Sequence, residues 1–193
     1  GHKNVIKASS NWLMADTSFS VQARAFKKSK ADVYLVSSHP FTTCGMLKEL
    51  ARQKAKPKLM IGLTSSSSAE TMKGCAKQAE GMIIPTSFAP VTPEAKAVAD
   101  VAAANGAAAD LHSAAAWENV MIIKDVMETV GVSANGENLQ ADRRAIRDGL
   151  EALKTTPGLI GTVTRNQEEG EALKPYVFVH AKGGNWEVLH DPR

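Results

Sequence analysis

The stretch DTSFSVQARAFKKSKADVYLVSS, residues 16–38, decides the fold of the chain. Asp16 is an expected helix N-cap, because a carboxylate can accept hydrogen bonds from the first free amides of a helix. Phe19, Ala23 and Phe26 then recur on one helical face. The next run, residues 32–37, is continuous and apolar at its centre, which is typical of a parallel strand covered on both faces.

The same order of helix and strand continues through the first half of the sequence. Further strands are expected at residues 5–8, 59–63 and 80–84. The intervening helices are expected to begin at caps formed by Thr42 or Thr43, by Ser67 with Glu70, and by Thr92. This alternation predicts an α/β fold in which helices cover both sides of a parallel sheet.

After residue 106 the pattern changes. One long helix is expected over residues 111–130, with Gly131 as its C-terminal cap and an inward apolar stripe that includes Trp117 and Val120. A second helix follows, then a glycine-containing, loop-rich passage over residues 158–170. Strands 176–180 and 186–189 form an expected hairpin at Gly183-Gly184.

Composition narrows the class of protein. The 193 residues are 44% hydrophobic and 22% charged, which is typical of a globular domain. The net charge is +3, and Lys and Arg are scattered among Asp and Glu rather than gathered into a stripe, so no nucleic-acid partner is expected. The first residues do not form a leader, which fits a cytoplasmic protein, or a mature or truncated form of an exported one.

A ligand-binding site is expected at the carboxyl ends of the strands, where ligands bind in open parallel sheets. We call these segments the rim: residues 37–41, 64–66 and 85–88. They contain hydroxyl groups and the rings of Phe41 and Phe88, but no carboxylate. The five histidines are too dispersed to predict a metal site, and no phosphate-binding loop is present, so no metal or cofactor is expected.

Cys44 supports an alternative, enzymatic interpretation. It follows a predicted helix start and lies close in sequence to His39, so it could be an activated thiolate. An unpaired cysteine is more often a small buried residue, and no acid-base set surrounds this one, so a non-enzymatic function is preferred. Whether Cys44 and Cys75 pair is left open by the sequence.

Five motifs, in order, resemble the second half of periplasmic solute-binding proteins of the leucine/isoleucine/valine-binding type. Residues 16–36 resemble the family's helix and strand, and Ala79-Glu80-Gly81 resembles its "AEG". The others are residues 115–120 (family "AYDAV"), 147–151 ("RDALE") and 158–170 (a glycine turn, with Arg165 and Asn166 replacing an aromatic residue and Asp). The resemblance covers nearly the whole chain.

The resemblance implies a periplasmic or extracellular protein that closes on a small solute in an interlobe cleft and delivers it to the membrane subunits of an ABC importer. It implies an α/β ligand-binding lobe over residues 1–108, crossing helices and a hinge segment of the other lobe over 109–175, and C-terminal strands over 176–193. The first half of such a protein would be absent, so self-association of exposed sheet edges is expected.

The ligand-binding residues implied by the resemblance are Ser38, His39, Pro40, Phe41, Thr64, Ser65 and His112. Amino-acid binders of the family usually have an acidic residue where Thr64 stands, to meet the substrate ammonium. We therefore expect an uncharged or acidic solute, preferably an aromatic carboxylate stacked on Phe41, over an amino acid. Alternatives are a ligand-sensing regulator or receptor domain of the same fold, and a small hydrolase or transferase that uses Cys44.

Overall fold

The computed structural model describes residues 5–166, 168 and 170–193. The chain divides into two compact units. Unit 1 comprises Gly1–Ala89 and Val177–Arg193, and unit 2 comprises Pro90–Tyr176. No helix in the described part of the chain is both long enough and apolar enough to cross a membrane.

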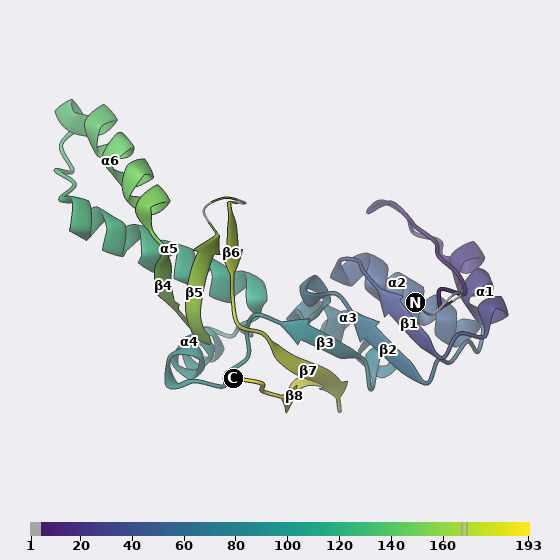
Figure 1. Ribbon diagram of the computed structural model, residues 1–193. Coiled ribbons are helices and arrows are strands. Elements are labelled where there is room, and N and C mark those ends of the chain that lie inside the picture. Colours follow the sequence, from purple (N-terminus) through teal and green to yellow (C-terminus); the bar gives the residue numbers. More distant parts are fainter. Residues whose placement is uncertain (1–4, 167, 169) are drawn as a thin grey trace. The chain divides into compact units, whose positions relative to one another are not determined.

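Unit 1 contains a five-stranded sheet in the order β1-β2-β3-β7-β8 (Figure 1). The first three strands are parallel, as the sequence predicts, and β7 adds to β3 in the antiparallel direction. Register partners include Val36 with Gly62 and Ile84 with Val179. The bounds are β1 Val33–Val36, β2 Leu59–Gly62, β3 Ile83–Thr86, β7 Val177–Lys182 and β8 Asn185–His190.

The helices of unit 1 pack on one face of this sheet. They are α1 Ser20–Ser29, α2 Pro40–Arg52 and α3 Ala69–Ala79, with a short 3-10 turn, η1, at Thr64–Ser66. Tyr34 and Val36 point into this core, whereas Leu35 on the opposite face is 69% exposed. The α/β class with a parallel sheet is confirmed. The expected cover on the second face is not found in the described residues: α1 packs against α2 and α2 against α3, while Leu35 on the second face is exposed.

Local details of the first elements differ from the sequence prediction. Residues 5–8 form no strand, because no described strand lies beside them to share backbone hydrogen bonds. Helix α1 begins at Ser20, and Asp16 instead accepts from the Leu13 amide. Helix α2 begins at Pro40, and α3 begins after Ser68 with no capping box, because the hydroxyls proposed as caps bond elsewhere.

Unit 2 is built from helices and a small antiparallel sheet, β4-β5-β6. Its helices are α4 Pro93–Ala104, α5 Leu111–Val130 and α6 Leu139–Ala152, with the turn η2 at Gly136–Asn138. Thr92 caps α4 and Gly131 ends α5, as predicted. The passage expected to be loop-rich, residues 158–170, contains strand β5 Gly161–Asn166, and the strands β4 Thr155–Gly158 and β6 Glu171–Leu173 flank it.

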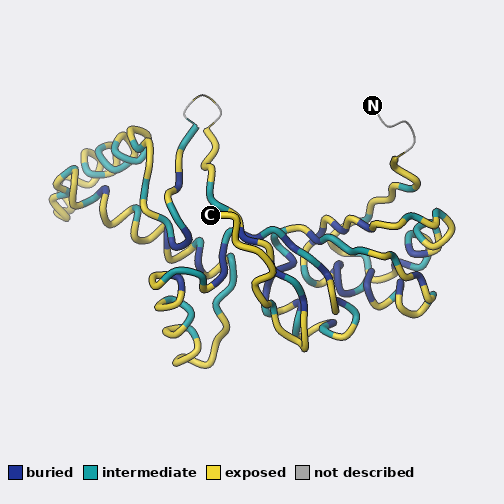
Figure 2. Tube along the Cα trace, turned by 60° about the horizontal axis from the view of Figure 1, so that its bottom comes forward, coloured by how far each residue is buried: buried dark blue, intermediate teal, exposed yellow. Residues whose placement is uncertain are grey.

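Much of α5 and all of α6 are exposed or half-buried (Figure 2). Trp117 is 45% exposed and Val120 is 65% exposed, so the expected inward stripe is wrong at these positions. The helix places three residues in the core, Ala114, Glu118 and Val126. Much of the apolar face of α5 is therefore not covered by other described residues, although its apolar side chains predict burial.

The observed division of the chain also differs from the predicted boundary at residue 108. Unit 2 begins at Pro90 and includes α4. The reason is local: Thr92 donates a hydrogen bond to the Leu159 carbonyl, which ties the start of α4 to the β4–β5 turn. Residues 177–193 belong to unit 1, because β7 pairs with β3.

Candidate functional site

Six of the predicted ligand-binding residues lie in unit 1, at the carboxyl ends of β1 and β2. Ser38 and His39 follow β1 and lead into α2, which begins at Pro40 and Phe41. Thr64 and Ser65 form η1, directly after β2. The structure brings the two segments together, since the Ser65 hydroxyl donates to the Ser38 carbonyl oxygen at 3.1 Å.

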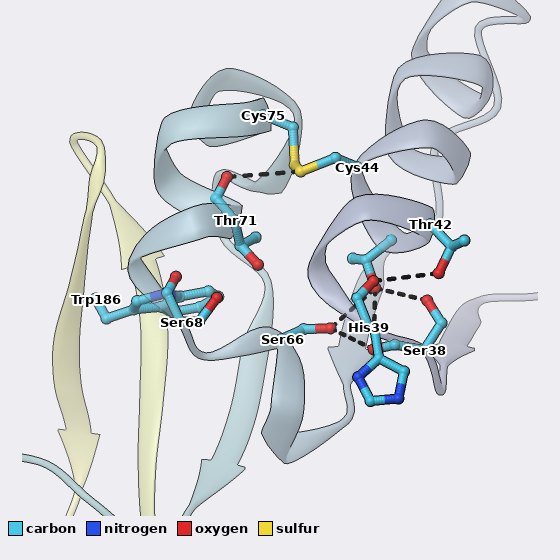
Figure 3. The surroundings of a disulfide bond; sticks show 10 residues. Ser38, His39, Thr42, Cys44, Ser66, Ser68, Thr71, Cys75 and Trp186 are labelled. Atoms are coloured by element: carbon cyan, nitrogen blue, oxygen red, sulfur yellow. Dashed lines mark hydrogen bonds between the residues drawn. A yellow bond between two sulfur atoms is a disulfide. The ribbon is translucent and has the colours of Figure 1, made fainter. Parts of the chain in front are cut away.

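A hydroxyl cluster of Ser38, Thr43 and Ser66 holds these segments in place (Figure 3). Thr43 Oγ1 lies 2.7 Å from Ser38 Oγ and 2.9 Å from Ser66 Oγ. Ser66 Oγ donates to the Ser38 carbonyl oxygen at 2.7 Å. One arrangement satisfies all three groups: Ser38 donates to Thr43, Thr43 to Ser66, and Ser66 to the carbonyl. All three side chains are buried, so the cluster fixes the loop rather than facing solvent.

Thr64 and its neighbours connect β2 to β3 in the same manner. The Thr64 hydroxyl donates to the Pro85 carbonyl oxygen at 2.8 Å, and Ser67 Oγ donates to Thr86 Oγ1 at 2.9 Å. Phe88 is 7% exposed, so the sequence expectation that its ring lies at the rim is wrong. Its backbone amide donates to Thr86 Oγ1, which turns the chain inward after β3.

The exposed residues of the rim are Ser37, His39 and Phe41, and the last two carry rings. Phe41 is 65% exposed although it lies at the start of a well-buried helix. Figure 3 shows the imidazole of His39 directed away from the hydroxyl cluster. These two side chains can offer an aromatic ring and a nitrogen donor to a ligand, whereas the hydroxyl cluster is already occupied by internal bonds.

Two helix N-termini, those of α2 and α3, follow the rim strands β1 and β2. The first amides of a helix have no partner within the helix, and the helix dipole is positive at that end. Neither N-cap side chain, His39 or Ser68, accepts a hydrogen bond from its helix. Two buried hydroxyls of the α3 start, Ser68 Oγ and Thr71 Oγ1, also have no hydrogen-bond partner among the residues that the structure describes. The local field therefore favours a negatively charged group.

His112 lies in unit 2. It is the second residue of α5, its side chain is exposed, and its backbone amide donates to Asp110 Oδ1 at 3.0 Å. Asp110 and Ser113 form a capping box there, so the polar character of this segment is explained by helix initiation. A ligand-binding role for His112 stays a prediction.

Cys44 is bonded to Cys75. The bond joins α2 to α3, and both residues are buried. Cys44 thus has no free thiol in this structure and cannot act as a nucleophile while the disulfide is intact. Among the described residues, no three His, Cys, Asp or Glu side chains gather as a possible metal site.

Sequence reasoning missed the supporting role of Thr43 and Ser66. The run of four serines at residues 65–68 was the available signal, because short polar side chains that bond to the backbone are typical of turns. Which of them is buried depends on α2 packing over η1, which the local sequence does not determine.

A sequence model of periplasmic binding proteins matches residues 8–185, and the chain therefore belongs to this family. The comparison with curated proteins gave no match. The fold is similar to that of the leucine-binding protein LivK from Thermotoga maritima MSB8, with 19% identity and a TM-score of 0.75 over 94% of this chain and 51% of LivK.

Two further solved structures are similar to this one. LivJ from Streptococcus pneumoniae, solved with isoleucine, has 16% identity and a TM-score of 0.76 over 93% of this chain and 50% of LivJ. An R. palustris solute-binding protein of an ABC transporter, solved with benzoate, has 14% identity and a TM-score of 0.76 over 92% of this chain and 47% of that protein. The chain thus spans about half the length of these proteins, and at such identities the likeness shows the fold.

Proposed function

We propose that the chain is part of an extracytoplasmic solute-binding component of an ABC importer, and that the rim of unit 1 helps to hold a small organic carboxylate. Membership of the periplasmic binding protein family supports the binding role. The Cys44–Cys75 bond supports the location, because disulfides persist mainly in oxidising compartments. The importer's membrane subunits would be the partners.

The solute class rests on the charge of the rim. The amides at the start of α2 and α3 favour an anion, each helix acting as about half a positive charge. No Asp or Glu occurs in residues 37–41, 63–68 or 85–88, so an ammonium group would be buried without a partner, at a cost of several kcal/mol. An acid without an ammonium group fits this rim better than an amino acid.

The exposure of the Phe41 ring is the observation that carries the proposal. Phe41 is a large aromatic side chain, 65% exposed, on the first turn of α2. Its ring can stack on a planar solute while the amides of α2 meet the carboxylate, so an aromatic carboxylate satisfies both groups. We propose that this solute is bound and released without chemical change.

Isothermal titration calorimetry of the protein with benzoate, leucine and benzamide tests the proposal. We expect benzoate to bind at least about tenfold more tightly than leucine, and the uncharged benzamide to bind at least about tenfold more weakly than benzoate, since 1.4 kcal/mol separates tenfold affinities. Phe41→Ala should weaken benzoate binding, whereas the control Leu35→Ala, at a similarly exposed position on the open sheet face, should not. Binding of leucine without benzoate would contradict the proposal.

A further inference from the structure

Unit 1 has an open cavity of about 300 Å³ whose lining includes five lysines. We call it the lysine pocket, and its lysines are Lys27, Lys30, Lys54, Lys56 and Lys58. They come from the end of α1 and from the segment between α2 and β2. The fold thus brings together lysines that are separated by up to 31 positions in the sequence. In the sequence alone these lysines form no cluster.

Hydrogen bonds and an ion pair hold the walls of the lysine pocket in place. Lys27 Nζ donates to the Gln53 carbonyl oxygen at 2.7 Å, and Gln53 Nε2 donates to the Ser20 carbonyl oxygen at 2.9 Å. These bonds hold α1 and the end of α2 together. Lys58 pairs with Asp32 at 2.7 Å, which joins the start of β2 to the start of β1. The buried ring of Tyr34 completes the lining.

Three of the lysines are uncompensated. The ammonium groups of Lys30, Lys54 and Lys56 have no hydrogen-bond or ion-pair partner among residues 5–166, 168 and 170–193. The hydrogen bond from Lys58 lowers the pKa of Asp32, so this carboxylate stays ionised and the pair adds no net charge. The C-termini of α1 and α2 offset only about half a positive charge each. Lys27 adds a fourth positive charge, because its partner is a neutral carbonyl, so an excess positive charge of about three remains around the cavity.

Backbone geometry at two of these lysines points the same way. Lys30 and Lys54 have left-handed conformations, with φ of 51° and 55°. Glycine or asparagine is usual there, because the Cβ of most other residues comes too close to the following carbonyl oxygen. A strained non-glycine residue at a charged cavity is a reason to look for a function.

We propose that the lysine pocket binds a phosphate-bearing anion with at least two negative charges. The volume suits a small ligand, and lysine ammonium groups bind phosphate oxygens as point charges. Free phosphates and the headgroups of anionic phospholipids share this chemistry. A flat acidic protein surface is a poorer match, because the free ammonium groups line a concave site. The proposal is independent of the solute bound at the rim.

The test compares two triple variants of the protein. Lys30→Gln/Lys54→Gln/Lys56→Gln removes the three unpaired charges, and Lys7→Gln/Lys77→Gln/Lys96→Gln removes three exposed charges elsewhere. Inorganic pyrophosphate is titrated by calorimetry into each protein, with circular dichroism as the check on folding. We expect saturable binding that the first variant weakens at least about tenfold and the control changes less than about twofold.

Co-sedimentation with vesicles distinguishes the two sources. Binding to phosphatidylglycerol vesicles but not to phosphatidylcholine vesicles, with competition by pyrophosphate, identifies the lipid headgroup. Pyrophosphate binding without vesicle binding identifies a free phosphate. The proposal is overturned if pyrophosphate does not bind, if both triple variants lose binding equally, or if only an acidic peptide such as polyglutamate binds.

Discussion

At the scale of single residues, the hydroxyl cluster of Ser38, Thr43 and Ser66 determines how the rim is held. Thr43 is fully buried and both accepts and donates within the cluster. Thr43→Val keeps the shape but leaves the Ser38 and Ser66 hydroxyls without this partner. We expect a loss of about 1–3 kcal/mol in the free energy of unfolding, measured by chemical denaturation.

The matched control for this change is Ser37→Ala at the neighbouring exposed position, which should stay within about 0.5 kcal/mol of the parent protein. A Thr43→Val protein with unaltered stability would show that the cluster does not hold the loop.

A second residue-scale prediction concerns Glu118, a buried carboxylate in unit 2. Its Oε1 accepts from the Leu159 amide at 2.8 Å, and its Oε2 pairs with Lys174. Glu118→Leu leaves both partners unsatisfied, so we expect a loss of about 3 kcal/mol in the free energy of unfolding. Adding Lys174→Met should restore part of that loss, because no unpaired ammonium then remains.

The double-mutant cycle measures this coupling by chemical denaturation of the four proteins. We expect an interaction free energy of at least about 1 kcal/mol, as found for residues in one ion-pair network. Strictly additive losses would mean that Lys174 is solvated rather than paired.

At the scale of elements, the Cys44–Cys75 bond fixes α2 against α3. It closes a loop with a sequence separation of 31, for which loop-closure entropy gives about 3–4 kcal/mol. Cys44→Ser/Cys75→Ser should therefore lower the free energy of unfolding by about this amount. A reducing agent should lower the melting temperature of the parent protein but not of the variant. Equal stability of oxidised and reduced protein would contradict this prediction.

Sequence predicted those elements whose signals are local. Thr92 begins α4 through its side-chain hydroxyl and Gly131 ends α5 through its left-handed backbone, and the local sequence predicts both. The Cys44–Cys75 pairing was left open, because disulfide formation depends on a Cα separation, here 5.3 Å, that sequence spacing does not give. Strands β4–β6 were missed because Thr, Pro and Gly dominate β4 and their pairing is set by neighbouring strands.

The candidate site was predicted less completely than the fold. Placing Ser38, Phe41 and Thr64 at strand ends needed only the order of helices and strands, and the structure puts them there. Exposure could not be predicted: Phe41 is solvent-exposed and Phe88 is buried, although each follows a strand in a similar polar setting. Packing of helices over the turns decides which aromatic ring remains accessible.

At the scale of the whole molecule, the small net charge conceals a division between the two units. Unit 1 contains fifteen Lys and Arg residues against seven Asp and Glu residues, a formal charge of +8. Unit 2 contains eight against thirteen, a charge of −5. The residues proposed to bind anions, at the rim and in the lysine pocket, thus all lie in the cationic unit.

This division predicts salt-dependent capture of an anionic solute. Unit 1 should attract a carboxylate at long range, and salt screens such attraction beyond about 8–10 Å at physiological ionic strength. We expect the association rate of benzoate, measured by stopped-flow fluorescence, to fall about threefold or more between 20 and 300 mM NaCl, within the range known for electrostatic steering. The dissociation rate should change little, because the short contacts at Phe41 and the α2 amides are barely screened. The pocket variant Lys30→Gln/Lys54→Gln/Lys56→Gln should slow association and leave dissociation unaltered. If salt acts on dissociation alone, the charge of unit 1 does not guide the solute, and binding depends only on the groups at the rim.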